Sequence, residues 1–149
     1  MGKRENYIDW DEAFMNLAKI ISQRSKDPST QVGACIVDNN HRVVSLGYNG
    51  FPNGCSDDDI RFTWDKSDDK VNGKHLFVVH AELNAILNAK RDLSGCTLYV
   101  THFPCNECVK AIIQSGIKRV LYNKFYNKNF DASKDMLDAA GVDYYLYDK

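Results

Sequence analysis

The sequence predicts an α/β fold, in which helices cover both faces of a mixed sheet of about five strands. Three observations support this prediction. Two β-rich stretches stand side by side near the start, strand-like and helix-like stretches alternate through the second half, and turn signals separate them. The first pair should be antiparallel, whereas strands joined through helices run parallel with right-handed crossovers.

The length and composition fit one domain without a nucleic-acid or membrane partner. The 149 residues match the usual size of a domain, so we expect residues 1–149 to form a single unit. The 19 basic and 20 acidic residues give a net charge of -1, which creates no general attraction for polyanions. No apolar run approaches the roughly 20 residues that span a bilayer, and the polar start lacks a secretory signal. We therefore expect a cytoplasmic protein.

The first helix should begin after Asp9 and run to about Ser25. Asp9 and Glu12 have the spacing of a capping box. The helix should stop at residues 26–28, because the position before a proline disfavours helical backbone. Between these signals, apolar side chains recur at helical spacing: Trp10, Phe14, Leu17 and Ile21.

A hairpin, a loop and an insertion should follow. Residues 32–37 and 43–48 are β-rich and flank turn residues at 38–40, which predicts the hairpin. The stretch 49–54 contains Gly, Pro and Asn and must be a loop. Residues 57–73 are strongly polar without a clean period, so we expect an inserted surface segment of the same domain.

The second half should alternate between helices and strands. Glycines stand where two of its helices should end. The expected elements are, in order, a helix at 80–90, a strand at 97–101, a helix opened by Pro104 and closed by Gly116, a strand near 120–122, a helix around 133–140 ended by Gly141, and a strand at 142–147.

Three residues have the chemistry of a catalytic zinc site. His80, Cys105 and Cys108 supply three protein ligands and leave a fourth position for water. The two cysteines directly follow Pro104 at a spacing that places both sulfurs at a first helical turn, where thiolates are favoured. His80 and Glu82 open another helix. We therefore expect two helix N-termini to meet at one metal, with Glu82 beside it.

These residues form H-x-E at 80–82 and P-C-x-x-C at 104–108, the signature of zinc-dependent nucleobase deaminases. In this chemistry, zinc lowers the pKa of water, and the resulting nucleophile attacks C4 of cytosine. Glu82 would accept the water proton and pass it to ring N3 and to the departing ammonia. One carboxylate thus serves both proton transfers.

Two plainer interpretations of the cysteines remain open. A thioredoxin-like redox pair would use the C-x-x-C motif alone, and it gives His80 and Glu82 no role. A structural Cys3His zinc site completed by Cys96 would close the fourth position, and it does not explain the carboxylate two residues after His80.

Beyond the zinc signature, the chain resembles the deoxycytidylate deaminase family over nearly its whole length. The resemblance implies a cytidine-deaminase-like three-layer α/β/α sandwich and zinc-dependent hydrolysis of dCMP to dUMP and ammonia. It also implies supply of dUMP for thymidylate synthesis and a homo-oligomer, commonly a hexamer. The matching stretches are 24–28 (RSKDP), 31–35 (QVGAC), 47–58 (GYNGFPNGCSDD), 80–86 (HAELNAI) and 103–108 (FPCNEC).

The same resemblance implies two nucleotide sites. For the substrate, it implies that Asn49 contacts the sugar and that Val32, Ala34 and Phe103 line the base pocket, with Arg24, Lys26 and Tyr126 as phosphate candidates. It further implies activation by dCTP and inhibition by dTTP, with Mg2+ accompanying the triphosphate. The regulatory site would comprise Arg4, Asn53, Gly54, Asp57 and Asp58.

The resemblance also bears on the number of zinc ions. Some members of the family carry a second, structural zinc with a carboxylate ligand two residues before the histidine. Val78 occupies that position, so we expect one zinc per chain.

Competing functions come from two other classes. A different H-x-E deaminase would act on tRNA adenosine or another small base, but a tRNA enzyme should present a basic face, which the even charge balance disfavours. Deaminases of free cytidine usually place cysteine where this chain has His80. A catalytically silent zinc-binding scaffold would have no use for Glu82.

Overall fold

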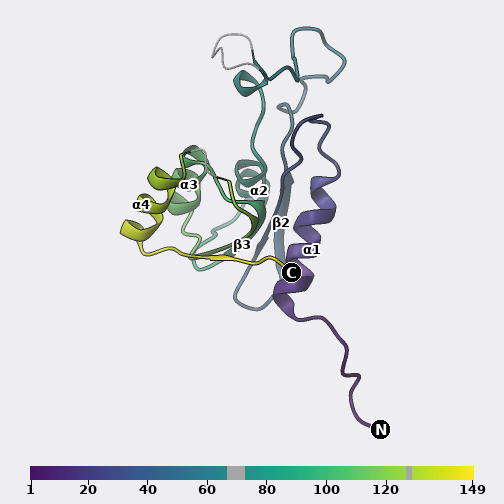
Figure 1. Ribbon diagram of the computed structural model, residues 1–149, viewed down its shortest axis with the longest axis vertical. Helices are drawn as coiled ribbons and strands as arrows, with labels where there is room; N and C mark the ends of the chain where they lie inside the picture. The colour runs from purple at the N-terminus through teal and green to yellow at the C-terminus, as the bar shows by residue number, and fades with distance from the viewer. Residues whose placement is uncertain (67–72, 127–128) are drawn as a thin grey trace.

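The computed structural model describes residues 1–66, 73–126 and 129–149, and it contains the predicted five-stranded mixed sheet (Figure 1). The strand order is β2-β1-β3-β4-β5. β1 pairs antiparallel with both β2 and β3, whereas β3, β4 and β5 are parallel. The strands are β1 (Gly33–Val37), β2 (Val43–Tyr48), β3 (Thr97–His102), β4 (Arg119–Lys124) and β5 (Asp143–Leu146).

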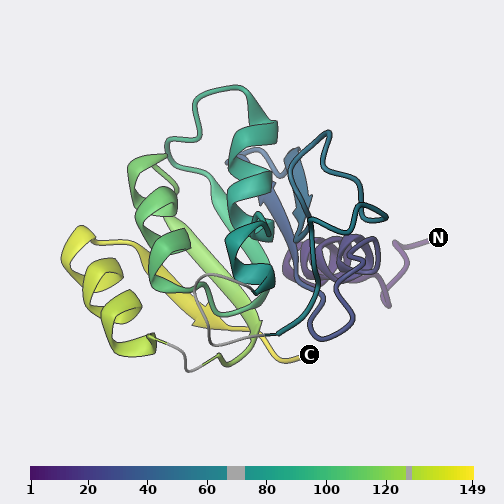
Figure 2. The same cartoon turned by 90° about the horizontal axis from the view of Figure 1, so that it is seen from above.

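Helices cover both faces of this sheet, which confirms the α/β/α prediction. Figure 2 shows α1 on one side of the strands and the other three helices side by side on the opposite side. Among the described residues, no helix is long and apolar enough to cross a membrane. The helices are α1 (Trp10–Ser22), α2 (Ala81–Ala89), α3 (Asn106–Gln114) and α4 (Phe130–Ala140).

Alternating side chains of the strands build two separate cores. On one face, Cys35 and Tyr99 pack with Phe14 of α1. On the other face, Ala34 and the remaining inward side chains pack with apolar residues of α2, α3 and α4. This period-two alternation gives the sheet two apolar faces, so each face needs a helical layer.

α1 has the predicted cap but ends early. The Asp9 carboxylate accepts a hydrogen bond from the backbone N–H of Glu12 at 2.8 Å. The helix ends at Ser22 instead of near Ser25, and a turn follows. The Ser22 hydroxyl donates to the Lys19 carbonyl at 2.6 Å, a local bond that competes with continued helix.

A backbone bridge joins the loop after β2 to the segment that leads into α2. Gly50 N–H donates to the Val79 carbonyl at 3.1 Å, and Val79 N–H donates to the Gly50 carbonyl at 2.8 Å. The residue after Val79 is His80. The bridge therefore holds the loop beside the start of α2.

The predicted insertion at 57–73 is described only in part. Residues 57–66 contain turns and bends but no helix or strand, as expected, and residues 67–72 lie outside the described part of the chain. The chain returns to the body of the protein through a short 3-10 helix, Lys74–Leu76.

Two helices in the second half begin at positions that differ from the prediction. α3 begins at Asn106 with Cys105 as its N-cap, so Pro104 precedes the helix. α4 begins at Phe130, before the predicted start near Ser133. Phe130 packs against the ring of Phe103 at 4.8 Å between centroids, a tertiary contact that sequence spacing does not reveal.

Candidate active site

Three metal-binding side chains converge where α2 and α3 begin. His80 is the N-cap of α2, Cys105 is the N-cap of α3, and Cys108 lies in the first turn of α3. His80 Nδ1 lies 3.3 Å from Cys108 Sγ and 3.5 Å from Cys105 Sγ. The three ligand atoms all lie within 4.8 Å of one another. This geometry agrees with the expectation that two helix N-termini meet at one metal.

The electrostatics of the two thiols favour a bound cation. The pKa of Cys105 is lowered to about 3, chiefly because Cys108 donates a hydrogen bond to its sulfur. The pKa of Cys108 is raised because its proton is held in that bond, and burial and the Glu82 carboxylate oppose a second negative charge. A divalent cation between the sulfurs would offset this repulsion, so the donor set fits zinc.

Cys96 does not extend this donor set. It is 1% exposed and packs in the core on the α2 side of the sheet, outside the cluster of candidate ligands among the described residues. The described cluster therefore offers three protein ligands. That number suits a catalytic zinc site better than a closed structural one.

Glu82 lies in the first turn of α2, beside Cys108, and is only 4% exposed. Burial raises the pKa of its carboxyl group, although the neighbouring His80 imidazole opposes the shift. A carboxyl group with a raised pKa accepts and returns protons more readily near neutral pH. The position and environment of Glu82 therefore suit acid-base chemistry at this cluster.

A cavity of about 510 Å³ opens in front of these residues, a size that suits a small-molecule ligand. Its lining next to the cluster comprises His80, Ala81, Glu82 and Cys105. Five further lining residues come from the ends of the strands and the loops after them: Val32, Asn49, His102, Phe103 and Tyr126. The remainder of the lining comprises Asp27, Thr30, Lys66, Lys74, His75 and Val78.

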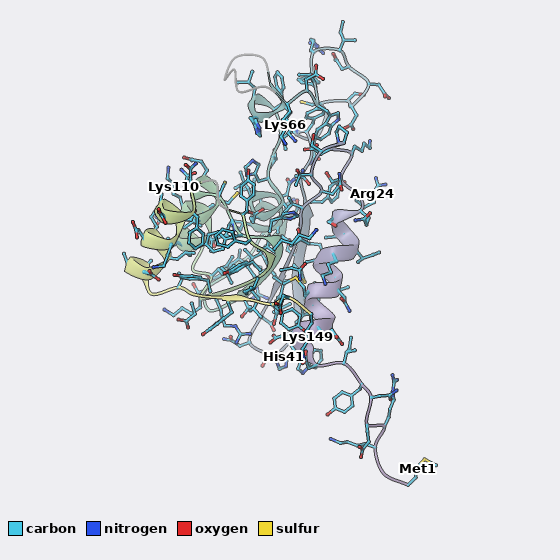
Figure 3. The ribbon with its side chains drawn as sticks, in the orientation of Figure 1. Met1, Arg24, His41, Lys66, Lys110 and Lys149 are labelled. Atoms are coloured by element: carbon cyan, nitrogen blue, oxygen red, sulfur yellow. The ribbon has the colours of Figure 1, made fainter. Side chains whose placement is uncertain are left out.

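The seven predicted substrate residues differ in where they lie relative to the cavity. Four of the seven line the cavity: Val32, Asn49, Phe103 and Tyr126. Ala34 is fully buried in the core behind it. Arg24 and Lys26 lie outside the lining, and Figure 3 shows Arg24 beyond the end of α1. Lys26 is 58% exposed and pairs with Asp57 at 2.8 Å.

Asn49 is buried, and its amide is occupied by the chain itself. Its Oδ1 accepts from the backbone N–H of Val32, and its Nδ2 donates to the Thr30 carbonyl, both at 2.9 Å. These two bonds hold residues 30–32, which lead into β1, against the loop after β2. Asn49 therefore shapes the cavity wall in addition to lining it.

The sequence model of the cytidine and deoxycytidylate deaminase zinc-binding region matches residues 8–124. The chain belongs to this family. The matched region runs from before α1 through β4, so it includes both helix N-termini and every candidate metal ligand.

Named relatives of the family match over most of their length. A probable deoxycytidylate deaminase of Drosophila melanogaster is 53% identical, covering 95% of this chain and 74% of the relative. The deoxycytidylate deaminase of Homo sapiens is 48% identical, covering 94% and 80%. Among solved structures, the dCMP deaminase of cyanophage S-TIM5 in complex with dCMP and dUMP matches with a TM-score of 0.75. That match has 30% identity and covers 95% of this chain and all of the phage chain.

The residues predicted for a regulatory nucleotide lie on the surface. Arg4 is in the exposed N-terminal arm, where its Nε donates to Asn6 at 2.9 Å. Asn53, Gly54 and Asp58 are exposed in the loop and insertion after β2, and Asp57 holds Lys26. The N-terminal arm before α1 lies at the end of the molecule opposite that loop (Figure 1). Within this chain, these residues do not form one cluster.

Sequence reasoning missed several polar residues of the cavity wall, among them Asp27, Lys74 and His102. Asp27 belongs to the segment that stops α1, and Lys74 directly follows the insertion without any motif of its own. His102 stands just before F-P-C, so its proximity to the zinc motif was the available signal.

His102 is held by a hydrogen bond to the residue before it. Thr101 Oγ1 accepts from Gly33 N–H at 3.1 Å and lies 2.8 Å from His102 Nδ1. Burial, together with the charge of Lys124, lowers the pKa of His102 and keeps the ring neutral. His102 thus brings a neutral imidazole to the cavity wall.

Proposed function

We propose that this chain is a zinc-dependent deoxycytidylate deaminase, which hydrolyses dCMP to dUMP and ammonia. The observation that carries the proposal is the buried Glu82 carboxylate beside His80, Cys105 and Cys108 at a cavity of about 510 Å³. Relatives named deoxycytidylate deaminase that are 48% and 53% identical support dCMP as the substrate. The phage dCMP deaminase in complex with dCMP and dUMP supports the same choice.

In this proposal, His80, Cys105 and Cys108 hold the zinc, whose Lewis acidity lowers the pKa of water. Glu82 accepts a proton from the water as its oxygen bonds to C4 of the base. Glu82 then delivers that proton to ring N3, takes the second proton from the oxygen now bonded to C4, and passes it to the amino nitrogen as the C4–N bond breaks, so that ammonia leaves and C4 keeps a carbonyl oxygen. Because α2 begins next to His80, its first turn fixes the Glu82 carboxylate close to the reacting carbon.

The cavity wall supplies the rest of the substrate site. We propose that Phe103 and Val32 contact the base, that Asn49 supports the sugar site, and that Tyr126 is a phosphate contact. Ala34 supports this wall from the core. Arg24 and Lys26 lie outside the cavity of this chain, so we propose that they reach a phosphate across a subunit boundary.

The remaining parts of the proposal concern regulation, assembly and metabolic role. They comprise activation by dCTP and inhibition by dTTP with Mg2+, a homohexamer, and supply of dUMP for thymidylate synthesis in the cytoplasm. Arg4 and the residues of the 53–58 loop are far apart in one chain, so a shared regulatory site would combine residues of two subunits. Saturation curves for dCMP with added dCTP or dTTP test the regulation directly, and unchanged curves would contradict it.

The test of the function is an ultraviolet assay for loss of the 4-amino chromophore. We expect rapid turnover of dCMP and much slower turnover of CMP, deoxycytidine and dCTP at equal concentrations. The Glu82→Ala variant gives the background rate of the assay, because it keeps the proposed metal ligands and removes the proposed proton carrier. Turnover of deoxycytidine or CMP in preference to dCMP would refute the substrate assignment.

A further inference from the structure

A buried ion pair lines the cavity outside the metal cluster. Lys74 Nζ lies 2.6 Å from Asp27 Oδ2, and the two side chains are 6% and 2% exposed. Both residues belong to the cavity wall. Removing two charges from water is costly, so a pair at this depth requires further polar partners.

The two members of the pair are unequally satisfied. The Asp27 carboxylate also accepts from the backbone N–H groups of Ser29 and Thr30, at 2.8 and 3.3 Å, and Asn49 Nδ2 lies 3.5 Å away. The Lys74 ammonium has three N–H donors, and within 1–66, 73–126 and 129–149 its one acceptor is Asp27. Buried donors are nearly always hydrogen-bonded. Among the described residues, two donors of Lys74 at the cavity wall are therefore available to oxygen atoms of whatever fills the cavity.

The geometry of cytosine indicates which part of the substrate meets this wall. C4, the reacting carbon, must lie at Glu82 and the metal ligands. N1, which carries the sugar, is directly opposite C4 in the six-membered ring. The sugar must therefore point away from the metal cluster, toward the rest of the cavity wall, in which Asp27, Asn49 and Lys74 lie together.

The charge of the pair favours a hydroxyl group over a phosphate. Asp27 neutralises Lys74 at 2.6 Å, so the pair has no net charge and its carboxylate would repel a phosphate dianion. A neutral hydroxyl oxygen accepts a hydrogen bond from the ammonium without that penalty. Building on the proposed function, we propose that Lys74 binds the 3'-hydroxyl of the substrate's deoxyribose through one of its two remaining N–H donors.

Three substrates separate the possible contacts. dCMP is compared with 2',3'-dideoxycytidine 5'-monophosphate, which lacks the 3'-hydroxyl, and with deoxycytidine, which lacks the phosphate. In the wild-type enzyme, we expect loss of the 3'-hydroxyl to lower kcat/KM by about 10- to 100-fold, the range for a hydrogen bond to a charged donor.

The decisive variant is Asp27→Asn/Lys74→Met, which removes the donor without leaving a buried carboxylate unpaired. We expect its kcat/KM for dCMP to fall by the same factor, while the dideoxynucleotide is turned over as in the wild type. The preference for dCMP over deoxycytidine should be unchanged. The matched control, Asp27→Asn, retains Lys74 and should still discriminate against the dideoxynucleotide. Zinc content and thermal unfolding of each variant establish that it is folded.

Two results would overturn the assignment. One is a double variant that still prefers dCMP over the dideoxynucleotide as strongly as the wild type. The other is a double variant that instead loses its preference for dCMP over deoxycytidine, which would make Lys74 a phosphate contact. Equal turnover of dCMP and the dideoxynucleotide by the wild-type enzyme would also refute it, and that result leaves the deaminase function intact. Failure to deaminate dCMP at all would refute the function itself.

Discussion

Two glutamates near the cysteines differ in every property that matters for proton transfer. Glu82 is 4% exposed, and burial raises the pKa of its carboxyl group. Glu107, between the two cysteines in sequence, has a side chain that is 72% exposed and pairs with Lys110 at 2.7 Å. Of the two, Glu82 is therefore the residue that we propose as the proton carrier.

Glu82→Gln keeps the size of the side chain but removes its ability to accept a proton. We expect kcat for dCMP to fall by about 10²- to 10⁴-fold, the usual contribution of a general acid-base group. Zinc content, measured by atomic absorption, should not change. Glu107→Gln is the control and should retain wild-type turnover; equal activity of the two variants would exclude Glu82 as the proton carrier.

At this scale, sequence reasoning was most informative where chemistry restricts residue type and spacing. The metal ligands and Glu82 were predicted because zinc needs few, characteristic donors at short spacings. The Lys74–Asp27 pair was missed, since it joins residues 47 positions apart and depends on the path of the chain around the insertion. Lysine and aspartate are also common on surfaces, so their presence gave no signal.

Among the elements, α2 lies unusually close to β2, and Gly47 permits this approach. A methyl group at Gly47 would overlap the carbonyl oxygen of Ala81 and lie 2.5 Å from the backbone nitrogen of Ala85. Both neighbours are backbone atoms of α2, which cannot move without shifting the helix that carries Glu82. The glycine thus couples packing of the sheet to the geometry of the site.

Gly47→Ala should therefore destabilise the protein by about 1–3 kcal/mol, the usual cost of overpacking a tight contact. Activity should fall as well, because α2 must move away from β2. The measurement is urea denaturation followed by circular dichroism. Gly50→Ala is the control, since its added methyl group would lie 3.8 Å from the ring of Tyr48, which is an ordinary van der Waals contact. Equal stability of the two variants would contradict this account of the packing.

Elements were easier to predict than their ends. The hairpin and the alternating second half follow from hydrophobic period and turn residues, which act locally. The ends of α1 and the starts of α3 and α4 depend on side-chain bonds and tertiary contacts, such as Ser22 to Lys19 and Phe130 to Phe103. Such contacts are set by the fold and not by the nearby sequence.

In the whole molecule, the three candidate metal ligands bring together segments that are distant in sequence. The other three cysteines lie outside this cluster and differ in their exposure. Burial raises the pKa of Cys35 to about 12 and also raises that of Cys96, so both thiols stay protonated inside the core. Cys55 is partly exposed in the loop after β2. The chemical reactivity of the five cysteines therefore reports separately on the core, the loop and the candidate metal site.

Iodoacetamide labelling of the zinc-loaded protein should modify Cys55 first. After removal of zinc with a chelator, Cys105 and Cys108 should become reactive, because thiolates freed from a metal are strong nucleophiles. Peptide mass spectrometry identifies each site, and Cys55 provides the internal control. Labelling of Cys105 and Cys108 at the same rate with and without chelator would argue against a shared metal.

The overall fold was predicted well because two apolar sheet faces and a β-α-β order leave few arrangements. The three predicted phosphate contacts do not meet in one chain, and they stay a prediction. Arg24 and Lys26 lie outside the cavity of one chain. Their positions in the sequence, shortly before the hairpin, do not predict on which side of the cavity wall they lie. Assembly of subunits, which one chain does not define, would decide their role.

The central claim is that one histidine and two cysteines hold a zinc ion with a position left open. Zinc K-edge X-ray absorption of the purified protein tests it most directly. We predict two sulfur neighbours at about 2.3 Å and light-atom neighbours at about 2.0–2.1 Å, of which one is the His80 imidazole. A shell of four sulfurs, a shell without sulfur, or the absence of zinc from fully active protein would contradict the account.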